Sequence, residues 1–403
     1  MTGRVVVTGC GVVSAIGHSA PSFWSNLVQG VPGIAEATIL PTDQLSQKVV
    51  AEVKKFDPRS HFDERQLASL DRVSQFAVVA AREALAQAAL PLHDGLSKAT
   101  ATIIGTGVGG QNTQDDNYSR LYRDGAKRLH PLTIPKLMVN APASQVTMHC
   151  GLRGPAFAVA SACSSATHAI GLAFQLVRSG AVTCAVTGGT DACLTFGTMK
   201  GWEAMRVMAP DTCRPFSRER KGLVIGEGAA VVVLESLDHA RKRSAEILGE
   251  IVGFGMSADA NDLTSPDVGG MARAVENALS DGGLAPEDVQ YINAHGTGTA
   301  ANDEVETNAI KHVFGAHSAR LAISSNKSML GHALGAAGAL ELVATLMSIK
   351  NAVVPPTINY LGPDPACDLD YVPNEARPLA IDAALSNSFA FGGLNAVLAV
   401  KRI

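Results

Sequence analysis

Short runs of β-branched residues alternate along the chain with segments of helical periodicity, and no other feature constrains the fold as strongly. The runs include RVVVTG, ATATIIGTG, AVTCAVTGG, AAVVVLES, VQYINAHG, RLAISS and NAVLAVKRI. Between them lie amphipathic segments such as SQFAVVAAREALAQAAL and GMARAVENALSDGG. Strands that alternate with helices build layered architectures. We therefore expect an α/β protein.

Two distant segments, residues 158–180 and 321–350, share one pattern. Each consists of a short strand, a turn of small polar residues and a helix that is apolar on nearly every face, which is typical of a buried helix. A chain of 403 residues can hold two domain-sized units or one duplicated architecture, and no linker-like stretch divides it. We interpret the pair as a duplication, with an N-terminal half at 1–252 and a C-terminal half at 253–403. The letters match weakly, so chance similarity is the alternative.

The bulk composition excludes several classes of protein. The chain carries 33 Lys plus Arg against 37 Asp plus Glu, and this balance is unlike that of a general nucleic-acid binder. Its seven cysteines form no CxxC pair, so we expect reduced thiols and no zinc site. The sequence shows neither a signal peptide nor an apolar run long enough to span a membrane. We expect a cytoplasmic protein.

Cys163 lies in VASACSSATHAIGLAFQLV, where an extended run gives way to an apolar helix. A thiol in the first turn of a helix feels unpaired backbone N–H groups, and these lower its pKa. The position therefore predicts a nucleophile. Tight packing by small residues is an alternative explanation, because cysteine is itself a small and usually buried side chain.

Two histidines are candidate proton-handling partners for such a nucleophile. His295 lies in NAHGTGT and His332 ends NKSMLGH, and both follow strand-like runs at glycine-rich turns. A lone histidine more often has a structural role. His239 and His312 lie among charged residues in expected surface helices, and we assign them no special role.

Glu341 is the one charged residue in HALGAAGALELVATLM, the helical run that begins at His332. A buried carboxylate must be paired or neutral. Lys327 is the nearest plausible partner, and the pair would tune the charge around the histidines. A glutamate that faces solvent is the alternative.

The segment SNSFAFGGLNAV, residues 386–397, places two phenylalanines beside a Gly-Gly turn. Glycines permit backbone conformations that present an N–H group to a ligand, which predicts an oxyanion-hole donor or a mobile gate. A hairpin that closes a sheet fits the segment equally well.

A formal GxGxxG pattern at Gly105, Gly107 and Gly110 follows a strand. The polar segment QNTQDDNYS comes next instead of an apolar helix, so the pattern is a weak dinucleotide fingerprint. The chain has no Walker lysine, no HExxH and no GxSxG motif. The sequence therefore gives no support for a phosphate-binding loop, a zinc protease or a serine hydrolase.

Taken together, these segments resemble the β-ketoacyl-[acyl-carrier-protein] synthases, and most closely the type II elongating branch with its nodulation-type members. The motifs are SACSSATHA, DTCRPFSRERKGLVIGEGAAVVVLE, NAHGTGTAANDEVE, NKSMLGHALGAAGALE and NSFAFGG, in that order, and the match runs from RVVVTG to AVLAVKRI. The resemblance implies a thiolase-like five-layered αβαβα fold built from two pseudo-symmetric halves. It also implies a homodimer, with a heterodimer as the alternative.

The resemblance assigns a role to each motif residue. Cys163 would be the acylated nucleophile of a Cys-His-His site with His295 and His332, supported by an ion pair between Lys327 and Glu341. The resemblance also implies that Thr297 and Thr299 line a channel for the phosphopantetheine arm, and that Phe391 is a gate whose N–H joins that of Cys163 in the oxyanion hole. It further implies an acyl pocket lined by Val108, Trp202 and Phe389. Carrier-protein docking would involve Arg65 and Arg206.

The implied activity is a decarboxylative Claisen condensation. An acyl group moves from acyl carrier protein to Cys163, and malonyl carrier protein then extends the fatty-acyl or polyketide chain by two carbons. The carrier's phosphopantetheine arm holds the substrates, and no metal or redox cofactor is expected. Alternatives are the catalytic subunit of a heterodimeric ketosynthase in a specialised lipid or polyene pathway, and a coenzyme A thiolase. A thiolase needs a second catalytic cysteine, and Cys367 in PACDLDY does not resemble one.

Three departures from the family pattern bear on substrate choice. The usual GFGGTN reads AFGGLN here, so Ala390 replaces a glycine and narrows backbone freedom beside the gate, while Leu394 replaces a threonine. Ala68 and Ser69 stand where basic residues often contact the carrier. Val108 is smaller than the residue that limits acyl length in some relatives, which predicts a longer or differently shaped chain.

Overall fold

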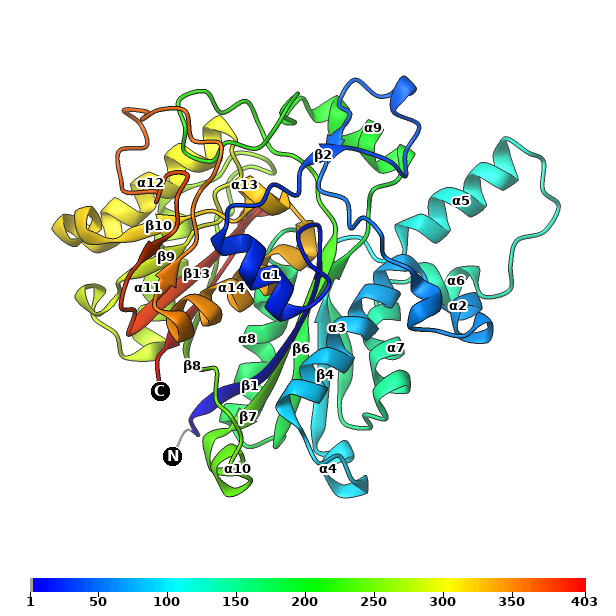
Figure 1. Cartoon of the computed structure of the whole chain (residues 1–403), viewed down its shortest axis with the longest axis horizontal. Coiled ribbons are helices and arrows are strands. Elements are labelled where there is room, and N and C mark those ends of the chain that lie inside the picture. Colours follow the sequence, from blue (N-terminus) through cyan, green and yellow to red (C-terminus); the bar gives the residue numbers. More distant parts are fainter. Residues whose placement is uncertain (1–2) are drawn as a thin grey trace.

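A ten-stranded sheet forms the centre of the computed structural model, which describes residues 3–403 (Figure 1). Its strands are β1 (Val5–Ser14), β4 (Thr100–Gly105), β5 (Ala156–Val159), β6 (Cys184–Asp191), β7 (Gly228–Ser236), β8 (Gly249–Ala258), β9 (Tyr291–Asn293), β10 (Ala322–Ser324), β13 (Ala383–Ala390) and β14 (Leu394–Lys401). Two small ribbons pair β2 (Ala35–Glu36) with β3 (Val49–Val50) and β11 (Val353–Val354) with β12 (Arg377–Pro378). Every strand predicted from a β-branched run is present.

The helices alternate with these strands, as predicted. They are α1 (Ala20–Val28), α2 (Glu64–Ser69), α3 (Arg72–Ala88), α4 (Asp94–Lys98), α5 (Gln111–Tyr122), α6 (Thr133–Leu137), α7 (Ala141–Cys150), α8 (Ser165–Arg178), α9 (Phe196–Met205), α10 (Leu237–Lys242), α11 (Val268–Gly282), α12 (Ala300–Phe314), α13 (Lys327–Leu330) and α14 (Ala337–Asn351). The two amphipathic segments form α3 and α11. Asp71 caps α3 by accepting a hydrogen bond from the Val73 N–H, which satisfies one of the unpaired donors of the first turn.

The sheet consists of two halves with the same connectivity. From the centre outwards the order is β1-β7-β6-β4-β5 in one half and β8-β14-β13-β9-β10 in the other, and β1 pairs with β8 at the seam. In each half the two inner pairings are antiparallel and the two outer pairings are parallel. The boundary predicted after residue 252 falls inside β8, which pairs with strands of both halves, and that boundary stays a prediction.

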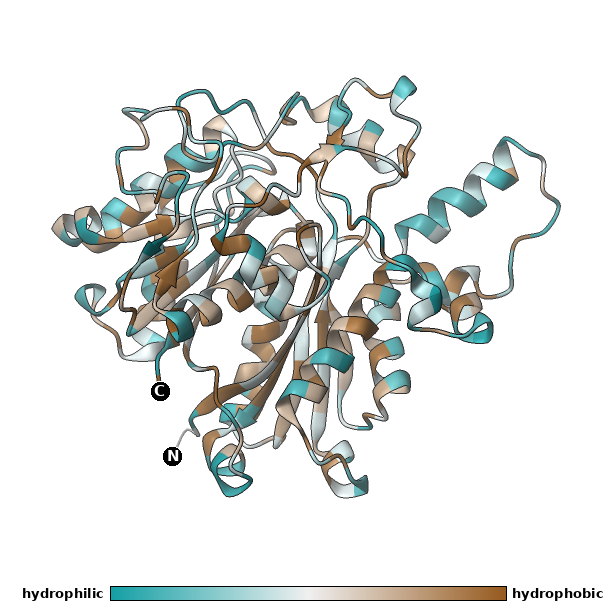
Figure 2. Cartoon of the chain, viewed as in Figure 1, coloured by the Kyte–Doolittle hydropathy of each residue, from teal (hydrophilic) through white to brown (hydrophobic). Residues whose placement is uncertain are grey.

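Two helices form the middle layer of the molecule. α8 packs on β4 and β6, α14 packs on β13, and the two helices contact each other, while α3 with α7 and α11 with α12 lie on the outer faces. Every residue of α14 from Ala337 to Ile349 is buried, as its uniformly apolar sequence predicts. A side chain at Gly338 would meet Oγ1 of Thr167 at 2.0 Å, so the close contact of the two helices requires glycine there. Hydrophobic residues accordingly concentrate on the strands and inner helices (Figure 2).

The glycine-rich run after β4 makes close backbone contacts. A Cβ atom on Gly105 would meet the backbone of Ser165 at 2.4 Å, and one on Gly110 would meet the carbonyl oxygen of Lys136 at 2.2 Å. Protein atoms therefore occupy the space beside these glycines. Tight packing explains the GxGxxG pattern without a dinucleotide.

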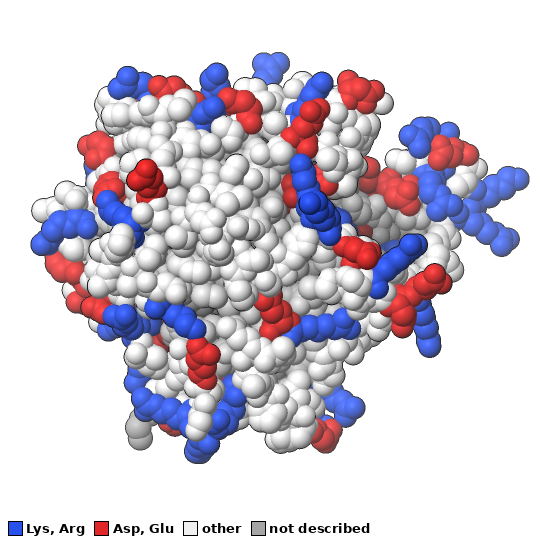
Figure 3. Space-filling model, viewed as in Figure 1, with Lys and Arg blue, Asp and Glu red and all other residues white. Residues whose placement is uncertain are grey.

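Residues 111–137, which hold α5 and α6, project from the body as an arm, drawn in cyan in Figure 1. Lysine and arginine side chains gather on the arm (Figure 3), among them the exposed Arg120, Arg123, Lys127 and Arg128. The charge pattern of the whole sequence did not reveal this local cluster, because the net charge is small.

Two further observations concern the state of the cysteines and the search for membrane-spanning helices. All seven cysteines carry free thiols. Among residues 3–403, no helix has both the length and the apolar character needed to cross a membrane.

Candidate active site

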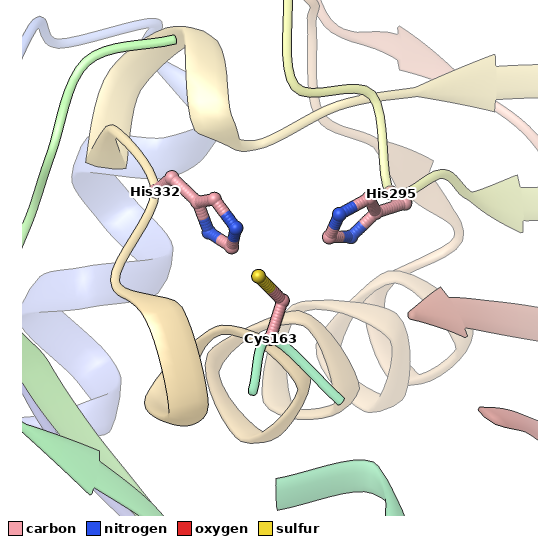
Figure 4. A group of neighbouring side chains, drawn as sticks. All are labelled: Cys163, His295 and His332. Carbon is pink, nitrogen blue, oxygen red and sulfur yellow. The ribbon is translucent and has the colours of Figure 1, made fainter. Parts of the chain in front are cut away.

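Cys163, His295 and His332 converge from three separate segments (Figure 4). Cys163 lies in the turn between β5 and α8, His295 follows β9, and His332 follows α13. The thiol sulfur and the nearest ring nitrogens of the two histidines all lie within 4.8 Å of one another. All three side chains are buried, and the imidazole rings meet edge to face with centroids 5.3 Å apart. The duplicated topology thus brings a nucleophile from one half to two histidines from the other.

The turn that carries Cys163 is strained and tightly held. Ala162 adopts a left-handed backbone conformation, with φ +50°, directly before the nucleophile. The hydroxyl of Ser161 shares a hydrogen bond of 2.8 Å with Nδ1 of His168, and Ser164 donates to the carbonyl oxygen of Leu394 at 2.7 Å. Non-glycine residues in this conformation persist only where the surroundings hold them, and they cluster at functional sites.

The expectation that the helix lowers the pKa of Cys163 is wrong. Burial raises the pKa of this thiol to about 11, because loss of solvent outweighs the stabilising charge of Lys327 and the hydrogen bond from the Phe391 N–H. The residue also precedes the helix: the N-cap is Ser164, and α8 begins at Ser165. Cys163 therefore rests as a neutral thiol at pH 7.

Both histidines are held neutral. Burial and the nearby Lys327 ammonium lower the pKa of His295 and of His332 well below the usual value. The Lys327 ammonium lies 3.3 Å from Nδ1 of His295 and donates to it, which leaves the ring proton on Nε2. Neither ring nitrogen of His332 has a hydrogen-bond partner among the described residues. These imidazoles can accept a proton or donate a hydrogen bond inside the cavity.

Lys327 and Glu341 form an ion pair in which both side chains are almost completely buried. The alternative that Glu341 faces solvent is wrong, since its exposed fraction is 1%. Lys327 also donates to the carbonyl oxygen of His295. A single ammonium group therefore neutralises Glu341 and fixes both the ring and the backbone of His295.

Glu306, on α12, holds the His295 loop from the other side. Its carboxylate accepts hydrogen bonds from the N–H groups of His295 and Gly296, both at 2.8 Å. The motif NAHGTGTAANDEVE contains this glutamate, but a run of polar residues at the start of a helix is typical of a surface that faces solvent. Only the observed burial reveals its contact with the loop.

The three side chains open onto a cavity that is also lined by five of the other ten predicted site residues. Its walls include Thr297, Thr299, Trp202, Phe389 and Phe391. The indole of Trp202 stacks on the ring of Phe391, with centroids 6.0 Å apart and planes inclined by 27°. Thr297 and Thr299 share a hydrogen bond of 2.9 Å between their hydroxyls.

The turn that carries Phe391 is both a hairpin and part of the cavity wall. Residues 391–393 connect β13 to β14, and Gly392 and Gly393 adopt φ +78° and φ +65°. The hairpin interpretation of SNSFAFGGLNAV is confirmed, and the oxyanion-hole donor or gate stays a prediction. Ala390 is extended, with φ −106°, a conformation open to any residue, so the alanine introduces no strain here.

Besides Lys327 and Glu341, three further predicted site residues lie outside the cavity wall. Val108 packs in an apolar cluster together with Trp202, and its contact with an acyl chain stays a prediction. Arg65 is exposed on α2, and Arg206 is exposed directly after α9. Cys367 is buried in a different cluster of the C-terminal half, where it does not line the cavity.

The loop after β8 was missed by sequence reasoning. Asp259, Leu263, Thr264, Ser265 and Pro266 all line the cavity. The carbonyl oxygen of Leu263 accepts a hydrogen bond of 2.7 Å from the Gly392 N–H, so this loop contacts the Phe391 turn. Its sequence, DANDLTSPD, has the polar composition of any surface loop and carries no signal of a site.

Two groups of side chains among residues 3–403 have ligand atoms close enough to hold a metal ion: Cys163 with His295 and His332, and Cys184 with Glu235 and His239. Lys327 places a positive charge beside the first group, which disfavours a second cation. In the second group Arg243 binds both carboxylate oxygens of Glu235. His239, whose side chain is 25% exposed, contacts the buried Glu235 at 2.5 Å, a contact that its charged sequence surroundings did not indicate.

Comparison with known proteins gives the site a family context. The family model described as Beta-ketoacyl synthase, N-terminal domain, matches residues 2–240, and the one described as Beta-ketoacyl synthase, C-terminal domain, matches residues 248–361. The chain is 49% identical over 403 residues to nodulation protein E of Rhizobium sp. (strain N33), with 100% of both chains covered. It is 42% identical over 406 residues to 3-oxoacyl-[acyl-carrier-protein] synthase 2 of Staphylococcus aureus (strain N315), covering 99% of this chain and 98% of the relative.

Solved structures agree with these matches along the whole length. The ishigamide ketosynthase/chain length factor superimposes with a TM-score of 0.96 at 35% identity, with 100% of both chains covered. A type II polyketide acyl-carrier protein in complex with its ketosynthase bound to the hexaketide gives a TM-score of 0.91 at 32% identity, again with 100% of both chains covered. The five-layered arrangement is thus thiolase-like, as predicted.

Proposed function

Because the chain belongs to the β-ketoacyl synthase family and is an acyltransferase of the ketosynthase type, we propose that it condenses malonyl-acyl-carrier-protein with an acyl group held on Cys163. The product would be a β-ketoacyl chain two carbons longer. The observation that carries the proposal is the convergence of one buried thiol and two neutral imidazoles on a single cavity.

The first step transfers the acyl group. A histidine accepts the proton of Cys163, and His332 is suited to this because both of its ring nitrogens are free of partners among the described residues. The sulfur attacks the thioester carbonyl, and the N–H groups of Cys163 and Phe391 bind the resulting oxyanion. The carbon–sulfur bond to the carrier breaks, and the carrier thiolate leaves with the proton.

The second step makes the carbon–carbon bond. The bond between the malonyl α-carbon and its carboxylate breaks, carbon dioxide leaves, and the electron pair forms an enolate. Hydrogen bonds from neutral His295 and His332 stabilise the enolate oxygen, and Lys327 keeps the donating proton of His295 on Nε2. The enolate carbon attacks the acyl carbonyl, the bond from the acyl carbon to the Cys163 sulfur breaks, and the released thiolate takes up one proton from water.

The substrate carrier is proposed to be an acyl carrier protein, the partner in the related polyketide complex. Its phosphopantetheine arm would pass Thr297 and Thr299, which line the cavity. Helix α2, which carries the exposed Arg65, lies on the same side of the molecule as the basic arm in Figure 1, so an acidic carrier would meet a cationic surface there. Arg206, which lies directly after helix α9, is the second candidate for a contact with the carrier protein. We propose no metal or redox cofactor, since the steps above need none.

We propose a homodimer that pairs through β5 and the arm. β5 is an edge strand, and its unpaired backbone groups can bind a second strand. Exposed large apolar side chains gather in the same stretch: Tyr118, Tyr122, Leu132, Ile134, Met138, Val139, Met148 and Phe157. The alternative is a heterodimer, in which a second, related subunit binds to the same surface. The free thiols fit a reducing compartment, so we propose a cytoplasmic location.

A specialised lipid pathway is the proposed setting, because the nodulation protein E match has the higher identity of the two relatives. A coenzyme A thiolase is less well supported. Cys163 is the only cysteine among the described residues that lines the cavity, whereas a thiolase needs two.

The test supplies purified protein with an acylated carrier and with malonyl carrier labelled with ¹³C at the malonyl carboxylate. Release of labelled carbon dioxide together with an unlabelled β-ketoacyl carrier two carbons longer supports the proposal. Turnover of β-ketoacyl-coenzyme A with free coenzyme A, and none with carrier proteins, would replace it with the thiolase alternative.

A further inference from the structure

Asp191 is a completely buried carboxylate that no step above uses. It ends β6 and accepts four hydrogen bonds, from the Thr106 hydroxyl at 2.7 Å and from the N–H groups of Gly107 at 2.9 Å, Val108 at 3.4 Å and Gly335 at 2.6 Å. The donors come from two loops of different halves. A carboxylate that satisfies donors from both loops ties them together in the interior.

The two loops meet backbone to backbone above this carboxylate. A Cβ atom on Gly335 would lie 2.2 Å from the Gly107 nitrogen, and one on Gly189 would lie 2.6 Å from the Gly335 carbonyl oxygen. No side chain fits at Gly335 while the Gly107 loop keeps its place. The position of the 333–336 loop is therefore set by direct contact as well as by Asp191.

The same loop begins directly after His332 and contains a strained residue. Leu334 has φ +48°, a left-handed conformation that is rare for a bulky side chain. Such strain persists only where neighbouring contacts hold it, and the Gly335 N–H bonded to Asp191 is the next backbone donor along the chain. On its other side, His332 pairs its backbone with Val224 and Gly226.

We propose that Asp191 is a positioning residue for His332. It holds the strained turn at Leu334 and Gly335, and that turn fixes the direction in which the His332 ring enters the cavity. Without the carboxylate, the turn relaxes and the ring moves away from the place where the enolate oxygen forms. The inference rests on the proposed function, because it concerns the second step of that reaction.

Three variants of the full chain separate positioning from stability. Asp191→Ala removes every acceptor. Asp191→Asn keeps one oxygen for the two glycine N–H groups, and its amide group can donate to the Thr106 hydroxyl. Asp71→Ala is the matched control, because Asp71 is also buried and accepts from Val73 and Thr113 while it lines no part of the cavity.

Three measurements are made on each variant. Hydrogen exchange, read by mass spectrometry, reports on peptides that contain Gly107 and Gly335 without any turnover. Malonyl decarboxylation gives kcat and KM, and intact mass gives acyl loading of Cys163. We expect Asp191→Ala to exchange faster at both glycines, to lose about 100-fold in kcat with KM little changed, and to load Cys163 more slowly, because His332 also accepts the thiol proton in the first step. Asp191→Asn should recover most of the protection and of the rate.

Equal slowing in Asp191→Ala and Asp71→Ala would overturn the proposal, because the effect would then follow stability alone. So would faster exchange at Gly335 with an unchanged kcat, or unchanged exchange at both glycines. Absence of decarboxylation in the unmodified protein would instead count against the proposed function. In that case the exchange data still decide whether Asp191 holds the turn.

Discussion

Lys327 donates to Nδ1 of His295 across 3.3 Å, and it also pairs with the buried carboxylate of Glu341. The ammonium thus sets the tautomer of one catalytic candidate while its own charge is balanced by a second buried group. The pair lies next to the cavity but touches no substrate position. Its removal should therefore affect two properties that can be measured separately, the reaction rate and the stability.

Lys327→Met should lower the rate of malonyl decarboxylation by about 100-fold, because His295 loses the donor that keeps its proton on Nε2. It should also reduce the free energy of unfolding by about 3–5 kcal/mol, since Glu341 is left buried without a partner. Steady-state kinetics and urea unfolding measure the two effects. The double variant Lys327→Met with Glu341→Gln should regain most of the stability and none of the rate. Recovery of the rate in the double variant would contradict a role for Lys327 at His295.

Alkylation of Cys163 by iodoacetamide should accelerate steadily as the pH rises from 6 to 10. Burial raises the pKa of this thiol to about 11, so the reactive thiolate is scarce at pH 7 and grows about tenfold with each pH unit below that pKa. Peptide mass spectrometry follows the modification at Cys163. A plateau below pH 8 would show a thiolate already formed at neutral pH, as in the helix-lowered thiol expected from the sequence.

Trp202→Ala should free the ring of Phe391, the residue predicted to act as a gate, and widen the cavity. The substitution removes the indole that stacks on the Phe391 ring, a contact of about 0.5–1.5 kcal/mol beyond the buried area. We expect faster loading of Cys163 and a shift toward longer acyl chains when carriers of different acyl length compete. Trp202→Phe keeps an aromatic partner and should stay close to the unmodified protein. An unchanged preference for acyl chain length in Trp202→Ala would contradict the prediction that Trp202 lines the acyl pocket.

Phe157→Lys should convert the proposed homodimer to a monomer. The residue lies on the edge strand β5 and is 39% exposed, so a dimer through this edge would bury the new charge against the second copy. Analytical ultracentrifugation measures the mass in solution. Leu361→Lys, at a side chain that is 65% exposed outside the β5 and arm region, is the control and should remain dimeric. A dimer that survives Phe157→Lys would place the interface elsewhere.

The layered fold was predictable from local patterns, whereas the site residues were assigned mainly through the resemblance of whole motifs to a known family. Alternating strands and helices indicated the architecture, and the uniformly apolar run after His332 indicated the buried helix α14. Cys163, His295 and His332 each stood at a turn after a strand-like run. Their convergence follows from the duplicated topology, in which corresponding turns of the two halves meet at the middle layer.

Other properties of the site depend on tertiary burial and were not predictable. The pKa of Cys163 was expected to fall because its position beside a helix is visible in the sequence, whereas its desolvation is not. The pairing of Glu341 with Lys327 was predicted beside a solvent-facing alternative, and only the observed burial decides between the two. Asp191 and the cavity loop at residues 259–266 have ordinary polar sequences, and only their contacts in the folded chain distinguish them.

The most direct test of the account is the covalent step on Cys163. Purified protein is incubated with acyl carrier proteins charged with a ladder of acyl lengths, and its intact mass is recorded beside Cys163→Ala and Cys213→Ala. Cys213 is a buried free thiol that does not line the cavity, so its variant should load like the unmodified protein. If Cys163 is the acylated nucleophile, we expect an acyl adduct that disappears only in Cys163→Ala. An adduct that persists in Cys163→Ala, or no adduct at any length on the folded protein, would contradict it.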